Sequence, residues 1–192
     1  MRKVVSMPDF KGYISDLGAP SANMYMMGGK DKSVCEKCKR PSCIHPRICK
    51  NLNTDHSPLT ELYREVDKIQ EVKKSFIGSG VRYDLLLHRS GNENVDKAAR
   101  EYTRELIKHH VSGRLKVAPE HTSDMVLHYM RKPSFKLFEE FKRVFDRINK
   151  EEVFSQLSTA EAYLNNAYTY LQDFQLMTED LQGRYKLADC TD

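Results

Sequence analysis

The sequence predicts an α/β fold with about three parallel strands, followed by a helical tail. Two observations support this prediction: short apolar strand-like segments alternate with amphipathic helical segments, and polar residues follow each strand-like segment closely. A strand, helix, strand order is typical of parallel sheets. Ligand-binding residues of such sheets collect at the carboxyl ends of the strands. The fold class therefore also predicts where a binding site lies.

Composition limits the kind of protein this can be. The 192 residues carry 31 Lys and Arg against 27 Asp and Glu, a formal net charge of +4 that gives only weak support to nucleic-acid binding. No run approaches the roughly 20 apolar residues of a membrane span, and the N-terminus lacks the apolar core of a secretory signal. We therefore expect a cytoplasmic protein without membrane association, in which cysteines stay reduced.

The first strand is expected over residues 12–17, and it ends in a run of small residues that allows close approach of a ligand. Asp16, Gly18 and Asn23 lie in this run and are candidate cofactor-binding residues. A carboxylate that caps the turn is an equally good interpretation of Asp16.

The second and third strands are expected over residues 74–84 and 115–122. The second strand runs into a glycine-bearing turn, where Ser79 and Arg82 could hold an anion, although Arg82 could instead pair with Asp84. Lys116 and Glu120 cluster at the carboxyl end of the third strand, where they form either a salt bridge or the polar wall of a pocket.

Four segments place apolar residues at helical spacing, and they lie between and after the strands. They cover residues 59–72, 94–110, 125–130 and 135–149. Asn94 or Glu93 is the expected cap of the second helix.

Four of the five cysteines fall within fifteen residues, at Cys35, Cys38, Cys43 and Cys49. A C-x2-C pair with two further cysteines predicts a metal site, because thiolates from one tight turn can reach the same ion. Zinc or an iron–sulfur cluster would fit, and His45 is a possible substitute ligand. Neighbouring Lys and Arg side chains would compensate the charge of the thiolates. Two disulfides or free structural thiols are the alternatives.

Several long motifs, taken in order, resemble the YgiQ-type (UPF0313) radical SAM proteins over residues 7–149. The motifs are FKGYISDLGAPSANMY (10–25), CEKCKRPSCIHPRICK (35–50), SGVRYD (79–84) and HHVSGRLKVAPEHT (109–122). The resemblance implies a fragment of a partial (β/α) TIM-like barrel. In that family a 4Fe-4S cluster cleaves S-adenosylmethionine reductively to a 5'-deoxyadenosyl radical.

The resemblance also implies roles by position in the barrel. The segment from Asp16 to Asn23 would hold the methionine amine, whereas Ser79–Arg82 and Lys116–Glu120 would line the ribose and carboxylate side. The family's C-x3-C-x2-C cluster motif is absent from this chain. The four cysteines would then form an auxiliary metal or cluster site.

Residues 1–150 are thus expected to be a partial radical SAM barrel segment, and residues 151–192 a separate helical tail, in a chain that is truncated or chimeric. Two candidate functions result. The first is a fragment of a radical SAM iron–sulfur enzyme, inactive alone, that binds S-adenosylmethionine. The second is a non-catalytic zinc-binding module with a role toward RNA.

Overall fold

The computed structural model describes residues 1–18, 21–112 and 115–152. The chain divides into two compact units, Met1–Asn149 and Lys150–Asp192. The strands, the core and the predicted site residues all belong to the first unit. The helical tail predicted over residues 151–192 lies outside the described residues, apart from its first two positions.

A small parallel sheet joins two segments that are far apart in the sequence. Strand β1 (Tyr13–Ile14) pairs in parallel with β2 (Lys74–Ser75), with Tyr13 opposite Lys74 and Ile14 opposite Ser75. The Phe76 N–H donates to the Ile14 carbonyl (2.8 Å), and the Leu17 N–H donates to the Phe76 carbonyl (2.8 Å). The parallel pairing predicted for the first two strands is therefore confirmed.

The expectation of about three strands is wrong for the described residues, which form two. No strand forms over residues 115–122 in the part that is described. The Val81 N–H donates to the Lys116 carbonyl (3.0 Å), so this segment lies beside the chain that leaves β2 without forming a ladder. Pro119 contributes to this result, because it has no N–H to donate to a neighbouring strand. The observed class is mixed α/β and mostly helical.

Helices make up most of the regular secondary structure of the unit. They are α1 (Arg2–Val5), α2 (Lys32–Glu36), α3 (Ser57–Asp67), α4 (Tyr83–Leu87), α5 (Glu93–His109), α6 (Asp124–Tyr129) and a last helix that begins at residue 135. The four predicted helices are all present, although α3 ends before Val72. Helices α1, α2 and α4 were not predicted, because four or five residues are too few for an apolar period to show.

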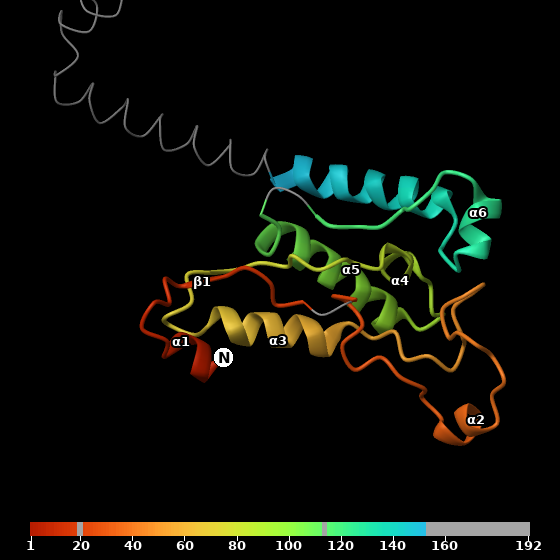
Figure 1. The fold of residues 1–192 in the computed structure, drawn as a ribbon, viewed down its shortest axis with the longest axis horizontal. Helices are drawn as coiled ribbons and strands as arrows, with labels where there is room; N and C mark the ends of the chain where they lie inside the picture. The colour runs from red at the N-terminus through yellow and green to blue at the C-terminus, as the bar shows by residue number, and fades with distance from the viewer. Residues whose placement is uncertain (19–20, 113–114, 153–192) are drawn as a thin grey trace, which may run out of the picture. The chain divides into compact units, whose positions relative to one another are not determined.

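The core forms where α3 packs against α5 and β2, and where α4 packs against α5. Figure 1 shows α3 and α5 side by side. Apolar residues at i and i+4 spacing face this contact from both helices, as helix geometry requires. The buried cluster consists of Ala22, Leu59, Tyr63, Ile77, Val81, Tyr83, Leu86, Tyr102, Leu106 and Phe141. Packing of the periodic faces therefore positions the loops that follow β1 and β2.

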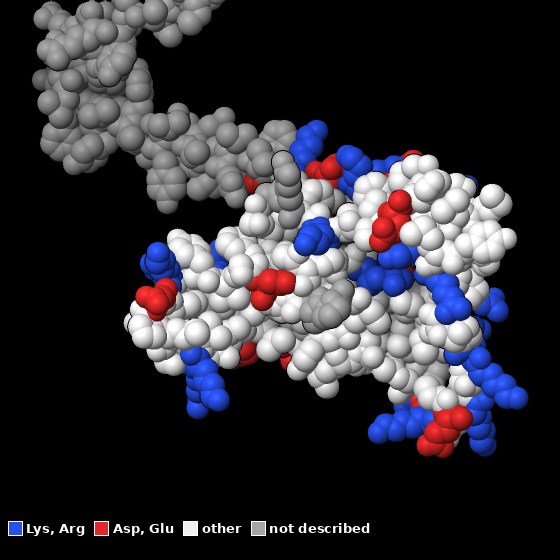
Figure 2. All heavy atoms as spheres, viewed as in Figure 1, with Lys and Arg blue, Asp and Glu red and all other residues white. Residues whose placement is uncertain are grey.

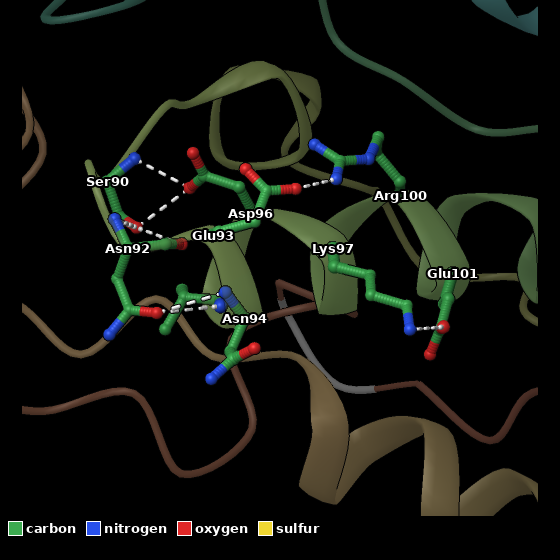
Figure 3. Close-up of polar contacts among 9 residues, drawn as sticks. Ser90, Asn92, Glu93, Asn94, Asp96, Lys97, Arg100 and Glu101 are labelled. Carbon is green, nitrogen blue, oxygen red and sulfur yellow. Dashed lines mark hydrogen bonds and ion pairs between the residues drawn. The ribbon is translucent and has the colours of Figure 1, made fainter.

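Asn92 caps the start of α5, in place of the predicted Asn94 or Glu93. Its backbone is extended, and its side-chain oxygen accepts from the N–H groups of Asn94 (3.0 Å) and Val95 (3.4 Å). Figure 3 shows this cap beside the ion pair between Glu93 and Arg100. An extended residue just outside the helix is the one whose side chain can reach the first free N–H groups.

A buried polar network ties the ends of α3 and α5 to β2. The Ser75 hydroxyl donates to Asp67 Oδ1 (2.6 Å) and lies 3.1 Å from His110 Nδ1. Because the Ser75 proton points to Asp67, Nδ1 of His110 is the donor to the Ser75 oxygen. Burial lowers the pKa of His110, although the Ser75 backbone and the Asp67 carboxylate oppose the shift. Ser75 is 1% exposed and His110 is 0% exposed, so the hydroxyl and the ring are closed to a substrate and stabilise the fold, while the Asp67 carboxylate reaches the surface.

None of the helices among the described residues combines the length and apolar character needed to cross a membrane.

Candidate functional site

Five consecutive residues, Gly78 to Arg82, connect the predicted binding segments to one another. Each bonds to a partner elsewhere in the chain through its backbone or side chain. Gly78 and Ser79 bond to Asp16, the Gly80 carbonyl accepts from the Ala22 N–H, Val81 bonds to Lys116, and Arg82 bonds to Asn23. We call residues 78–82 the connecting segment. It follows β2 closely, which is why one strand end gathers residues from three parts of the chain.

Asp16 and Ser79 meet at the carboxyl ends of β1 and β2. Asp16 Oδ1 accepts from the N–H groups of Gly18 (2.7 Å) and Gly78 (3.0 Å), and its Oδ2 accepts from the Ser79 hydroxyl. Partial burial raises the pKa of Asp16, but the Ser79 hydroxyl and the backbone donors of Gly18, Gly78 and Ser79 outweigh it and lower the pKa. Asp16 is ionised at neutral pH and caps the turn, while its side chain still faces solvent.

Gly18 is required by this close approach. A Cβ added at Gly18 would lie 2.6 Å from the Ser79 Cβ and 2.7 Å from Asp16 Oδ1. Any side chain there would push the Asp16 and Ser79 segments apart. The predicted set of Asp16, Gly18 and Ser79 is therefore one compact cluster.

Asn23 is fully buried and fixes the backbone at Arg82. Its Oδ1 accepts from the Arg82 N–H (2.7 Å), and its Nδ2 donates to the Arg82 carbonyl (3.0 Å). Nδ2 also lies 3.4 Å from His56 Nε2, and the His56 ring stacks on Tyr102. Burial lowers the pKa of His56 to about 4, although the Thr54 backbone and the Asp55 carboxylate oppose the shift. Asn23 therefore positions the backbone and has no free donor of its own to offer.

The remaining predicted residues point in other directions. Arg82 forms a two-pronged ion pair with Asp84, at 2.8 Å and 2.5 Å, as the alternative interpretation expected. That hydrogen bond raises the pKa of Arg82. Glu120 pairs with Lys132 (2.9 Å), and Lys116 meets the connecting segment through its carbonyl. The structure thus brings the Lys116 backbone to the connecting segment, whereas the Glu120 carboxylate bonds to Lys132 and not to the Asp16 cluster.

Hydrogen bonds within the cysteine loop, residues 35–49, hold its backbone, including those from the Ile44 and His45 N–H groups to the Ser42 hydroxyl. Its thiols form no disulfide with one another, and Cys35, Cys38 and Cys43 are exposed. The Cys49 N–H donates to the Cys43 carbonyl (2.7 Å), and the Cys38 N–H donates to the Cys35 carbonyl (3.0 Å). Within the described ranges no three His, Cys, Asp or Glu side chains are gathered as metal ligands. The four-cysteine site, with His45 as substitute, accordingly stays a prediction.

Asn51 and Gly29 hold Cys35 and were missed in the sequence. Asn51 Nδ2 lies 3.2 Å from the Cys35 sulfur and donates to the Asp31 carbonyl (2.8 Å). A Cβ added at Gly29 would overlap the Cys35 sulfur. An N–H group aimed at sulfur is a common outer-shell contact of metal-bound thiolates. No local pattern predicts these contacts, because 16 residues separate Asn51 from Cys35.

A cleft of about 520 Å³ lies beside the cysteine loop and shares only Arg82 with the predicted cofactor-binding set. The loop residues 44–48, the residues around α4 and those of α6 form its walls. His45 lies in it, and its ring centroid is 5.2 Å from that of His128. Partial burial and then the charges of His128, Arg131 and Arg82 lower the pKa of His45.

Comparison with known proteins identifies close relatives. A UPF0313 protein of Bacteroides thetaiotaomicron is 67% identical over 152 residues, which are 79% of this chain and 24% of that protein. One of Porphyromonas gingivalis is 61% identical over 150 residues, with 78% and 24% covered. One of Pseudomonas putida is 46% identical over 145 residues, with 76% and 18% covered. The chain thus spans about a quarter, or less, of the length of these relatives.

No protein-family model matches the chain. No solved structure matches it either.

Proposed function

Because the chain belongs to the UPF0313 family and matches its relatives over about three quarters of its own length, we propose that it is a segment of an S-adenosylmethionine-dependent radical enzyme. In this proposal the segment is part of a (β/α) barrel. It contributes a surface for S-adenosylmethionine and a separate metal site at the cysteines. A 4Fe-4S cluster would supply reductive cleavage of the sulfonium. The chain lacks the family's C-x3-C-x2-C motif, so we expect no such cleavage by this chain alone.

One observation carries the proposal: Asp16 and Ser79 meet where two adjacent parallel strands end. Open parallel sheets bind their ligands beyond the carboxyl ends of the strands. Asp16 is ionised and exposed, with two N–H donors on Oδ1 and the Ser79 hydroxyl on Oδ2. Oδ2 is thus the less occupied oxygen, and the ammonium group of an amino acid would donate to it.

The other residues of the proposed site have supporting roles. Ser79 and Gly18 hold the Asp16 carboxylate in place, and Asn23 fixes the chain at Arg82. Lys116 and Glu120 would line the ribose and carboxylate side, as positions on the next segment.

The chemistry of the cysteine loop fits a soft metal centre. Cys35, Cys38, Cys43 and Cys49 are four sulfur donors, and Asn51 already directs an N–H group at one of them. Their present separation is compatible with this function, because metal ligands on a loop often converge only when the ion binds. Four thiolates close the coordination sphere of zinc and can also hold a cluster. The reducing cytoplasm expected from the sequence would keep the thiols available.

Binding of S-adenosylmethionine tests the first part of the proposal. We expect saturable binding to the purified chain in equilibrium dialysis, weakened at least about tenfold by Asp16→Asn, because a charged hydrogen bond is lost. Asp146→Asn is the matched control, since Asp146 is exposed on the last helix and pairs with Lys142. Absence of saturable binding, or equal affinity in the Asp16 and Asp146 variants, contradicts the proposal.

Metal analysis tests the second part and separates the two candidate functions. The chain, reconstituted anaerobically with iron and sulfide, should show visible sulfur-to-iron absorption that Cys38→Ser abolishes. Stoichiometric zinc without iron would favour the zinc-binding module instead. Retention of full metal by Cys38→Ser would exclude the cysteine loop.

A further inference from the structure

The cleft beside the cysteine loop is built from three separate stretches of chain. Residues 44–48 of the loop form one wall, residues 82–89 around α4 form the second, and residues 124–137 around α6 form the third. Figure 1 shows the loop, α4 and α6 at one end of the unit. The volume of about 520 Å³ lies within the range of small-molecule sites, roughly 300–1,000 Å³.

Positive charge dominates the cleft. Five cationic side chains line it, against two carboxylates; the cations are Arg47, Arg82, Arg89, Arg131 and Lys132. Figure 2 shows Lys and Arg side chains gathered at this end of the molecule. Both carboxylates are already occupied: Asp84 pairs with Arg82, and Asp124 accepts from the Ser134 hydroxyl and the Phe135 N–H. The net field in the cleft is therefore positive.

Three of the five cations are available to a ligand. Arg47, Arg89 and Arg131 are exposed, and within the described ranges none of their guanidinium groups bonds to a carboxylate. They come from three different walls, so they surround the cleft instead of lying on one face. A planar guanidinium can donate two parallel hydrogen bonds to a phosphate, which makes arginine well suited to this ligand.

The cleft also has an apolar part. Ile44, Ile48, Leu87, Leu127 and Leu137 contribute to its lining. A small ligand with an organic body and an anionic group fits this combination. Single-stranded RNA fits it less well, because such sites usually stack successive bases on large aromatic side chains, and the described lining has three His rings but no Phe, Tyr or Trp.

We propose that this cleft binds a small organic phosphate, with Arg47, Arg89 and Arg131 on the phosphate oxygens and the apolar lining against the organic part. The site shares Arg82 with the proposed S-adenosylmethionine surface but contains neither Asp16 nor Ser79, the two residues that carry that proposal. S-adenosylmethionine itself carries no phosphate. The two proposals can therefore fail separately.

Equilibrium dialysis of the whole chain against radiolabelled pyrophosphate tests the phosphate part of the site. At fixed ionic strength we expect saturable binding with a Kd below about 1 mM, weakened at least about tenfold by Arg89→Gln and by Arg131→Gln. Arg100→Gln is the matched control, since Arg100 is an exposed arginine of α5 that pairs with Glu93 outside the cleft. Its affinity should stay within about twofold of the parent.

Arg89 and Arg131 are both exposed, so these variants should keep the fold, and urea midpoints check that they do. Absence of saturable pyrophosphate binding overturns the proposal, as does equal weakening in the Arg100 variant. A third arm uses a single-stranded RNA oligomer. RNA binding that depends on Arg89 and Arg131 and is not displaced by pyrophosphate would also overturn it, in favour of an RNA surface.

Discussion

Polar side chains are buried in one region of the molecule and exposed in another. The buried region is the core around α3 and α5, which we call the packed layer, and the exposed region is the cysteine loop. In the packed layer Asn23, His56 and His110 are fully buried, and each has a polar or aromatic neighbour fixed by the core. In the cysteine loop three of four thiols are exposed, and the Asn51 amide supports one of them. Burial fixes the side-chain positions in the packed layer as the chain folds. In the cysteine loop the four sulfur atoms are present but are not gathered around one point.

This difference is compatible with the metal site proposed at the cysteine loop. Folding favours a partner for each buried polar group, because leaving one unpaired costs about 1–3 kcal/mol, although His110 Nε2 has no hydrogen-bond partner among the described residues. An exposed thiol meets no such demand, since water solvates it. Folding therefore does not require partners for the thiols of the loop, whereas it fixes the side-chain positions of the residues near β1 and β2.

The largest difference should appear when the two regions are truncated. Leu106 is 0% exposed in the core, so Leu106→Ala should lower the free energy of unfolding by about 2–5 kcal/mol, measured by urea denaturation. In metal-free protein Cys43→Ser should change it by less than about 0.5 kcal/mol, because Cys43 is exposed. Similar losses in both variants would show that the loop is packed as firmly as the core.

Acid should destabilise the packed layer through His56. The pKa of His56 is about 4 in the folded chain against an ordinary value of 6.5, because burial disfavours the charged ring. Above about pH 6.5 the ring is neutral in both states. Between about pH 6.5 and 4 the unfolded chain takes up a proton that the folded chain does not, so stability falls, by on the order of 3 kcal/mol in total.

Urea midpoints measured across this pH range check the prediction. His56→Gln should flatten part of the slope, because it removes the titrating ring. The burial of His110 lowers its pKa in the same direction, so some slope should remain. An unchanged slope in the Gln variant would show that His56 does not cause the loss.

Asn51 should matter for metal affinity more than for folding. Asn51→Ala removes the N–H group at the Cys35 sulfur, and such outer-shell losses weaken metal binding by about 10–100-fold. Competition against a chelator measures the affinity. Asn94→Ala is the control, since Asn94 is exposed on α5. Equal metal affinity in the two variants would remove Asn51 from the site.

The smallest effect is expected for charge on the outer face of the packed layer. Arg64 pairs with Glu105 across α3 and α5 at 2.9 Å, but its side chain is 52% exposed. Arg64→Gln should therefore cost less than about 1 kcal/mol in urea denaturation. A larger loss would mean that ion pairing, and not apolar burial, joins the two helices.

Apolar periodicity predicted the long helices, because Tyr63, Tyr102 and Leu106 face one contact at regular spacing. It failed for α4, where Tyr83, Leu85 and Leu86 are buried in a helix of five residues that sequence alone could not distinguish from a strand end. The prediction of a third strand was wrong for a related reason: a short apolar segment does not show whether its backbone will pair. Leu115 and Val117 suit a strand, yet among the described residues the segment forms a single backbone hydrogen bond with the connecting segment, at the Lys116 carbonyl.

For the candidate site, the sequence predicted which residues would lie at the strand ends but not the hydrogen bonds that they form. The parallel fold class predicted that Asp16 and Ser79 would lie near each other, and they share a hydrogen bond. It did not predict that Asn23 would turn to the Arg82 backbone, or that Glu120 would pair with Lys132. Those partners depend on how loops close over long sequence separations, which no local spacing records.

A substitution at Gly29 would change the position of a cysteine sulfur without replacing any cysteine. Since the Cys35 sulfur occupies the space that a methyl group at position 29 would need, Gly29→Ala would act as a wedge that displaces one donor while all four sulfurs remain in the chain. A cysteine substitution removes a sulfur and changes the loop at the same time. Gly29→Ala would change only the loop geometry, so the two effects could be measured separately.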